Sequence, residues 1–249
     1  MKEKIALIDG DSLIYYEMSK PTLEEALQGI DTRIRHMLEQ CEATKYAGFL
    51  TSGRCFRYAA AKTKPYKGNR KYGNKPIIFP AIKEYLRQEW NFISMPELEA
   101  DDLVSIYHEP MKTIICSPDK DVLYQNRICN YNYGKAEMIA VDENESLKFL
   151  WKQMLMGDST DGITGIPKVG AKTADTWLKD LLPHEMPTFV LNKYVEKFGY
   201  AEGITKFAET FKLVYILKTK EDVLRETGIE LPELVTYDVE PLNENDEWL

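Results

Sequence analysis

Eight carboxylates lie where predicted helices and strands begin or end, and together they favour metal chemistry. They are Asp9, Glu99, Asp101, Asp102, Asp119, Asp121, Asp158 and Asp161. Carboxylates gathered in one crevice would repel one another and raise their pKa values unless cations were present. Their oxygens suit hard cations such as Mg²⁺ and Mn²⁺, and two such ions ~3.5–4 Å apart stabilise the attacking and leaving oxygens of phosphodiester hydrolysis. No His/Cys ligand set accompanies the acids, which argues against zinc.

The spacing of these acids would bring them to one edge of a sheet. Asp9 ends the apolar run "KIALID" and Asp119 follows the run "KTIICS". Both therefore fall at the carboxyl ends of predicted strands, where ligands bind in parallel sheets. Glu99 and Asp102 are three residues apart in "ELEADD" and share one face of a predicted helix. The acids are thus expected to converge.

A glycine-containing turn follows the last acid pair in "GDSTDGITGIPKVGAKTA". Asp158 and Asp161 would share one helical face if their stretch is helical. Gly165 and Gly170 frame a turn ahead of a predicted helix, and the backbone N–H groups there could hold a phosphate. The acid pair and the turn therefore favour a metal site next to a phosphate site.

The charge of the chain is strongly segregated. The net charge is −8, yet no Asp or Glu occurs between Glu42 and Glu84. This interval holds ten cations: Lys45, Arg54, Arg57, Lys62, Lys64, Lys67, Arg70, Lys71, Lys75 and Lys83. Removing these ten positive charges leaves −18 for the rest of the chain, and residues 229–249 hold seven acids without Lys or Arg. The basic interval is expected to hold a polyanion; the alternative is a solvated loop without a partner.

The hydrophobic pattern predicts an α/β fold. Strands are expected over 4–9, 46–51, 91–95 and 112–117, and helices from Ser12, from Thr22 to Cys41, and over 76–90 and 99–107. Such alternation predicts a mainly parallel central sheet flanked by helices. Asp11 is expected to cap the helix from Ser12 and to stay outside the metal site.

Three units are expected along the chain. They are an α/β core over 1–156 with a basic arch at about 52–75, a helical lobe over 157–220, and an acidic C-terminal segment over 221–249 whose end, 229–249, is a loosely held tail. The four cysteines contain no CxxC and are expected to be reduced thiols in a cytoplasmic protein. No apolar run approaches the ~20 residues of a membrane span.

Five motifs in order resemble the flap-endonuclease-like 5′-nucleases, a family that includes the amino-terminal domain of bacterial DNA polymerase I and bacteriophage exonucleases. They are "LIDGDSL", "FRYAAAKTKPYKGNRK", "ELEADDLVSIY", "CSPDKDVLYQ" and "LMGDSTDGITGIPKVGAKTA". The resemblance runs from Asp9 to about Thr173. It implies a PIN-like core followed by a helical lobe that contains a helix-hairpin-helix.

The resemblance also implies roles for single residues. The first metal cluster would be Asp9, Glu99, Asp101 and Asp119, with Asp102 beside it, and the second would be Asp121, Asp158 and Asp161. Lys67 and Arg70 would meet the scissile phosphate. Other DNA contacts would come from Arg54, Arg57, Lys62, Lys64 and Lys71, and from Gly165, Lys168, Gly170, Lys172 and Thr173 around the hairpin, where K⁺ could bind.

The sequence departs from the family pattern at three places. Thr51 and Ser52 stand where the family usually supplies another acid to the first cluster. Gly162 replaces an Asn that often follows the last Asp. Lys168 replaces the first hairpin glycine, which reduces backbone freedom but adds a cation.

The resemblance implies an Mg²⁺-dependent nuclease, with two ions and with Mn²⁺ as a substitute, acting on DNA with a free 5′ end or flap. RNA–DNA hybrids stay open as substrates, the protein is expected to be a monomer, and a replication protein could dock on the acidic tail. Tyr58, Tyr66 and Tyr72 would either stack on unpaired bases or pack the arch.

Two other functions stay open. "LIDGDS" also resembles the Asp-x-Asp of haloacid-dehalogenase-type phosphatases, in which Asp9 would be a covalent nucleophile. The missing acid at Thr51 leaves room for a non-catalytic DNA-binding relative.

Overall fold

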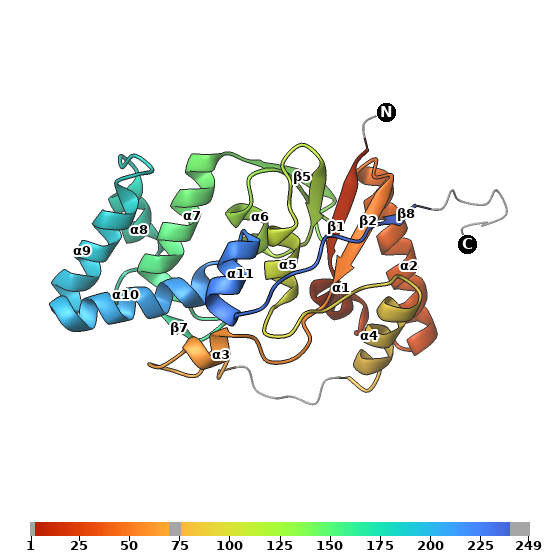
Figure 1. Ribbon diagram of the computed structural model, residues 1–249, viewed down its shortest axis with the longest axis horizontal. Helices are drawn as coiled ribbons and strands as arrows, with labels where there is room; N and C mark the ends of the chain where they lie inside the picture. Colours follow the sequence, from red (N-terminus) through yellow and green to blue (C-terminus); the bar gives the residue numbers. More distant parts are fainter. Residues whose placement is uncertain (1–2, 70–75, 240–249) are drawn as a thin grey trace.

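The computed structural model describes residues 3–69 and 76–239, and a six-stranded sheet crosses one half of it (Figure 1). The strands, in spatial order, are β5 (Glu137–Val141), β4 (Ile128–Asn132), β3 (Thr113–Cys116), β1 (Ile5–Asp9), β2 (Lys45–Phe49) and β8 (Tyr237–Asp238). β1 to β4 run parallel, and β5 and β8 are antiparallel at the two edges. The predicted mainly parallel sheet is confirmed.

Helices cover both faces of this sheet because successive side chains of a strand point to opposite faces. Ala6 and Ile8 face α1 (Gly10–Glu17), α2 (Leu23–Gln40) and α4 (Phe79–Gln88). Leu7 faces the other way, toward a core that contains side chains of α5 (Ala100–Ile106), α6 (Lys120–Gln125) and α11 (Lys220–Thr227). Since all three strand residues are completely buried, β1 is the centre of the fold.

A helical lobe with its own apolar core follows the sheet. Its helices are α7 (Glu143–Met156), α8 (Ala171–Leu178), α9 (Met186–Phe198) and α10 (Tyr200–Val214). α7 contributes Met154 and Leu155 to this core, although it precedes the boundary expected at residue 156. The short helix α3 (Arg57–Ala60) belongs to the basic interval and lies against α10 (Figure 1).

The stretch that carries Asp158 and Asp161 is not helical. Between α7 and α8 the chain forms a small antiparallel hairpin, β6 (Gly157–Asp158) and β7 (Ile163–Thr164). Gly157 requires its glycine because its φ is +74° and a Cβ would lie 2.3 Å from the Gly165 nitrogen. The two acids therefore flank a turn instead of sharing a helical face.

The predicted strand over 91–95 is reduced to a single bridge between Phe49 and Ile93. The reason is competition for one edge of β2, because β8 pairs with the Lys45 end of that edge. Segment 91–95 reaches only the other end of it, where Ile93 N–H donates to the Gly48 carbonyl (2.9 Å).

Residues 229–239 are not a loosely held tail. They end in β8, and Ile229, Leu231 and Leu234 pack on the core beneath α5 and α11. The Tyr107 hydroxyl also donates to the Pro232 carbonyl (2.9 Å). The remainder of that prediction, 240–249, lies outside the described residues.

The first helix begins two residues earlier than expected, and Asp11 does not cap it. The N-cap is Asp9, whose carboxylate accepts the Ser12 N–H (3.2 Å). Asp11 instead accepts the N–H of Thr51 (3.2 Å) and so joins α1 to the end of β2. In the part of the chain that the structure describes, no helix is both long and apolar enough to cross a bilayer.

Candidate active site

Three strand and helix ends bring a first group of acids together around Asp101. Asp9 ends β1, Asp119 is the N-cap of α6, and Glu99 is the N-cap of α5. Burial raises the pKa of Asp101 well above its usual range, and the negative charges of Asp9, Asp119 and Glu99 raise it further. Burial also raises the pKa of Asp9 to about 6, against hydrogen bonds from Ser12 and Ser117. Asp9 and Asp101 therefore have little compensating positive charge, whereas Glu99 has cationic partners of its own.

A second group of acids forms around Asp121. Burial raises its pKa to about 6, and the charges of Asp119 and Asp158 act in the same direction. Lys120 opposes this shift, with its Nζ 3.0 Å from Asp121 Oδ1. Asp119 therefore interacts with both groups, as a residue between two ion sites should.

Asp161 contacts Asp158 of the second group through its backbone N–H, which donates to Asp158 Oδ1 (3.4 Å). Its carboxylate accepts a hydrogen bond from the Tyr66 hydroxyl (3.1 Å) and lies 3.7 Å from Lys67 Nζ. Tyr66 is buried and also donates to Glu99 (2.9 Å). Tyr66 is therefore part of the site and does not offer a free ring face for stacking on bases.

Lys67 projects into the acids from the basic interval. Its Nζ lies 2.5 Å from Glu99 Oε1, and its backbone N–H donates to the Asp161 carbonyl (2.7 Å). The residue has a φ of +54°, a left-handed conformation that this backbone contact accompanies. Its position agrees with the predicted role at the phosphate, whereas Arg70, Lys71 and Tyr72 lie outside the described residues.

Glu99 is surrounded by positive partners. Burial would raise its pKa, but Arg57 and Lys67 hold it at about 2, and Tyr66 contributes a hydrogen bond. Both carboxylate oxygens are engaged, Oε2 with Arg57 and Tyr66 and Oε1 with Lys67. Metal ligation by Glu99 stays a prediction.

Asp102 is not a metal ligand, contrary to the sequence prediction. Its side chain is completely buried, and Oδ1 accepts from Arg57 Nη2 (2.7 Å) and the Leu217 N–H (3.1 Å). Oδ2 accepts from Arg57 Nη1 (2.7 Å) and the Glu99 N–H (3.2 Å). With four donors on two oxygens, Asp102 has no lone pair directed at an ion.

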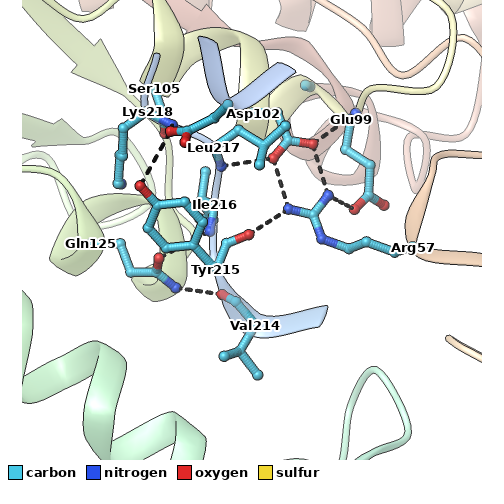
Figure 2. A network of polar contacts seen from close by, with 12 residues as sticks. Arg57, Glu99, Asp102, Ser105, Gln125, Val214, Tyr215, Ile216, Leu217 and Lys218 are labelled. Atoms are coloured by element: carbon cyan, nitrogen blue, oxygen red, sulfur yellow. Dashed lines mark hydrogen bonds and ion pairs between the residues drawn. The ribbon is translucent and has the colours of Figure 1, made fainter. Parts of the chain in front are cut away.

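Arg57 is not a surface cation available to DNA, which also contradicts the prediction. It is 2% exposed, and its guanidinium lies between Glu99, Asp102 and the carbonyl of Tyr215 (Figure 2). By contrast Arg54, three residues earlier, is exposed and lies over the ring of Tyr58 (5.0 Å). Sequence alone could not distinguish the two arginines, because Arg57's partners lie 42 to 158 residues away.

The base of the basic interval is held by an acid that sequence reasoning missed. The carboxylate of Glu209 in α10 accepts hydrogen bonds of 2.6 Å from the N–H groups of Lys62 and Thr63 and from the Thr63 hydroxyl. Lys62 and Lys64 themselves are exposed, and Lys64 lines a cavity of about 190 Å³ beside β7. No local pattern around Glu209 indicates this role.

The turn ahead of α8 presents an exposed surface. Lys168 has a φ of +69°, the left-handed region that favours glycine, so its substitution for glycine strains the backbone. Gly170 is the N-cap of α8, and a Cβ there would meet nothing within 4 Å. Lys172 and Thr173 lie in the first turn of α8, with Lys172 exposed. Position 165 must be glycine because a Cβ there would lie 2.3 Å from the Gly157 nitrogen. This glycine therefore serves close packing of the backbone and not an exposed binding surface.

Comparison with known proteins indicates the family. The chain is 31% identical over 211 residues to a 5′-3′ exonuclease of Aquifex aeolicus, which covers 76% of this chain and 66% of the relative. It is 25% identical over 192 residues to the flap endonuclease Xni of Shewanella woodyi, over 70% and 76% of the two chains. These similarities support a flap-endonuclease-like 5′-nuclease family for the chain. No family model matches it.

The fold of the chain is shared with a solved bacteriophage structure. A bacteriophage T5 protein co-crystallized with metal ions superposes with a TM-score of 0.64 at 16% identity, over 91% of this chain and 97% of the other. The chain covers just under two thirds of the Aquifex relative's length.

In this chain the position of the missing family acid is filled by residues that make structural contacts. The Thr51 hydroxyl accepts the N–H of Ala100 at the start of α5 (3.0 Å), and the Thr51 carbonyl accepts a hydrogen bond from Lys83. The Ser52 hydroxyl donates to the Met95 carbonyl (2.9 Å). Both side chains therefore join the end of β2 to the segment that leads into α5.

The acids of the chain fit a hydrated divalent cation better than a closed metal cage. Within residues 3–69 and 76–239, no three Asp, Glu, His or Cys side chains form a group that could enclose an ion. The raised pKa values of Asp9, Asp101 and Asp121 show negative charge that a cation would compensate. Mg²⁺ is commonly held by one or two carboxylates, with water and substrate phosphate completing its shell.

Proposed function

We propose that the protein is a divalent-metal-dependent 5′ nuclease that hydrolyses phosphodiester bonds in DNA with a free 5′ end or flap. The observation that carries this proposal is the group of mutually repelling acids at the carboxyl edge of the sheet, with the cation of Lys67 beside it. The exonuclease and flap-endonuclease names of the relatives support it. The substrate and product classes are those of the family, namely a 5′-phosphate and a 3′-hydroxyl.

Two ion positions are proposed from the two groups of acids. Asp9, Asp101 and Asp119 would hold the first Mg²⁺, and Asp121 and Asp158 the second, with Mn²⁺ as a substitute. When bound, such ions supply Lewis-acid polarisation of the phosphate and lower the pKa of an attacking water.

The chain's own contribution to the chemistry is fixed positive charge. Lys67 is held among the acids by Glu99, so its ammonium is fixed before substrate arrives. Its charge would stabilise the negative charge that develops on the phosphate. Arg70 is proposed for the same role, as the family motif implies.

The duplex is proposed to lie across two exposed surfaces. One is the basic interval, with Arg54, Lys62 and Lys64. The other is the turn over 165–173, as a helix-hairpin-helix with K⁺, through Lys168 and the Gly170 backbone. Four further points are proposals of the same kind. They are the division of the chain into 1–156, 157–220 and 221–249, the monomeric state, RNA–DNA hybrids as substrates, and a replication protein as partner.

The first test is cleavage of an end-labelled 5′-flap duplex in Mg²⁺, Mn²⁺ or EDTA. Metal-dependent cleavage near the flap junction that is lost in Asp158→Asn would support the proposal. Asp180→Asn is the matched control, because Asp180 is exposed and contacts only its neighbour Lys179. Tight flap binding without cleavage in either metal would show a DNA-binding relative.

The phosphatase alternative receives no support from the surroundings of Asp9. Its carboxylate is completely buried and accepts hydrogen bonds from the Ser12 N–H (3.2 Å) and the Ser117 hydroxyl (2.8 Å). The acids around Asp101 and Asp121 and the cation of Lys67 also have no role in that mechanism, in which a single carboxylate attacks the phosphate.

A further inference from the structure

Arg57 is a buried cation that makes no contact suited to DNA. Its Nη1 donates to Glu99 Oε2 (3.0 Å) and Asp102 Oδ2 (2.7 Å), and its Nη2 donates to Asp102 Oδ1 (2.7 Å) and the Tyr215 carbonyl (2.8 Å). The planar fork of a guanidinium can satisfy these three partners at once, which a lysine cannot do. The geometry therefore holds Glu99 in one place.

The other partners of this network are themselves fixed. Asp102 binds the Leu217 N–H, and Gln125 accepts from the Ile216 N–H (3.1 Å) and donates to the Val214 carbonyl (2.8 Å). The segment 214–217, which follows α10, thus passes between α5 and α6 with its backbone held from both sides (Figure 2). It is a rigid support for the guanidinium.

The charges alternate from this support to the proposed catalytic cation. Asp102 holds Arg57, Arg57 holds Glu99, and Glu99 Oε1 lies 2.5 Å from Lys67 Nζ. The same Glu99 is hydrogen-bonded by Tyr66, so its carboxylate has a single orientation. Displacing Arg57 would release Glu99, and with it Lys67.

We propose that Arg57, with Asp102 and the segment 214–217 behind it, is a positioning residue that sets the place of Lys67 through Glu99. This inference rests on the proposed nuclease function. A misplacement of ~1 Å in a reacting group can lower the rate about 100-fold, so the effect should fall on kcat. Because Arg57 is buried, the affinity for DNA should not change.

The first experiment uses Arg57→Lys, which keeps the charge but loses the fork, with Arg127→Lys as the matched control because Arg127 is exposed and pairs with Glu143. We expect Arg57→Lys to lower kcat on a 5′-flap duplex about 100-fold, while the flap affinity in EDTA changes less than about twofold. Combined with Glu99→Gln, Arg57→Lys should lower kcat little further, because residues that act through one another are not additive.

A second readout needs neither metal nor cleavage. The amine of Lys67 is labelled with an acetylating reagent in the free protein and quantified by mass spectrometry, with exposed Lys64 as the internal reference. Arg57→Lys should label Lys67 severalfold faster, and Arg127→Lys should not. If wild type does not cleave, the nuclease proposal fails while this labelling still tests the positioning.

Two results would overturn the inference. One is weaker flap binding in Arg57→Lys with unchanged kcat and unchanged Lys67 labelling, which would make Arg57 a DNA contact. The other is full additivity of Arg57→Lys and Glu99→Gln. Thermal melting verifies folding, and if Arg57→Lys does not fold, Asp102→Asn removes the same support and takes its place.

Discussion

Adjacent acids at the start of α5 have opposite surroundings. Asp101 faces the carboxylates of Asp9 and Asp119, whereas Asp102 faces the guanidinium of Arg57. Successive residues of a helix point about 100° apart, so one short turn can serve two purposes. The carboxylate of Asp101 faces other acids and suits a bound cation, whereas the charge of Asp102 is neutralised by Arg57 and has a structural role.

Substitution of these two acids should therefore change stability in opposite directions. In EDTA, Asp101→Asn removes a repelling charge and should raise the free energy of unfolding by about 1 kcal/mol while abolishing cleavage. Asp102→Asn removes the carboxylate that binds both ends of the Arg57 guanidinium, so that Glu99 is left to balance this buried charge, and it should lower the free energy of unfolding by about 3 kcal/mol. Urea unfolding of both variants measures the difference; an equal loss in both would contradict this account of the acids.

The metal-free protein should lose stability as pH rises. The pKa values of Asp9 and Asp121 are raised to about 6 from an ordinary value of 3.8, so the folded state binds protons more tightly. Their stabilising protonation is complete below pH ~4 and is lost as pH rises through about 6. Thermal melting in EDTA between pH 4 and 7 should show this fall, and Mg²⁺ should remove most of it. A melting temperature that rises over this range would contradict it.

At the level of elements, the position of α5 depends on the end of β2. Thr51 accepts the Ala100 N–H through its hydroxyl and donates its own N–H to Asp11. Three elements, α1, β2 and α5, are thereby joined at the edge where the acids lie. Thr51, which stands where the family usually has an acid, therefore links these three elements.

Thr51→Val should test this junction, because valine keeps the shape but leaves the Ala100 N–H without its acceptor. We expect a loss of about 1 kcal/mol in the free energy of unfolding and slower cleavage at unchanged flap affinity. Thr51→Ser keeps the hydroxyl and is the matched control. Equal stability of the two variants would mean that the hydroxyl contributes nothing.

The sequence predicted the elements that depend on local pattern and missed the contacts that depend on distance. The buried run of β1, the Thr22 cap of α2 and the acids at the carboxyl edge follow from periodicity and spacing. The burial of Arg57 and the hold of Glu209 on Thr63 could not be predicted, since both join residues more than 40 positions apart. The lost strand over 91–95 has the same origin, because the competing β8 lies near the other end of the chain.

At the scale of the whole molecule, some cations of the basic interval lie on the surface of the folded protein and others are buried against acids. Of the predicted DNA contacts in the basic interval, Arg57 is neutralised internally, while Arg54, Lys62 and Lys64 are exposed. Lys67 is turned toward the acids. Among the described residues of the interval, the predicted DNA contacts that stay exposed are thus Arg54, Lys62 and Lys64, and Glu209 holds the backbone beside the last two.

The salt dependence of flap binding should report this remaining surface. Each phosphate contact contributes about 0.9 to the slope of log K against log salt for duplex DNA. Lys62→Gln with Lys64→Gln should therefore reduce the slope by about 2 and weaken binding uniformly across sequences. Lys20→Gln with Lys179→Gln, at exposed positions away from the basic interval, is the control. An unchanged slope would place the DNA elsewhere.

The edge strand β8 has a consequence for synthesis of the chain. β2 lies between β1 and β8, so Tyr46 near the beginning of the chain pairs with Tyr237 near its end. The sheet cannot be completed until Tyr237 has left the ribosome, and contacts this distant in sequence slow folding. During translation the nascent chain would carry an unpaired β2 edge, which is a site for aggregation or for chaperone binding. A premature stop shortly before Tyr237 would make that transient exposure permanent.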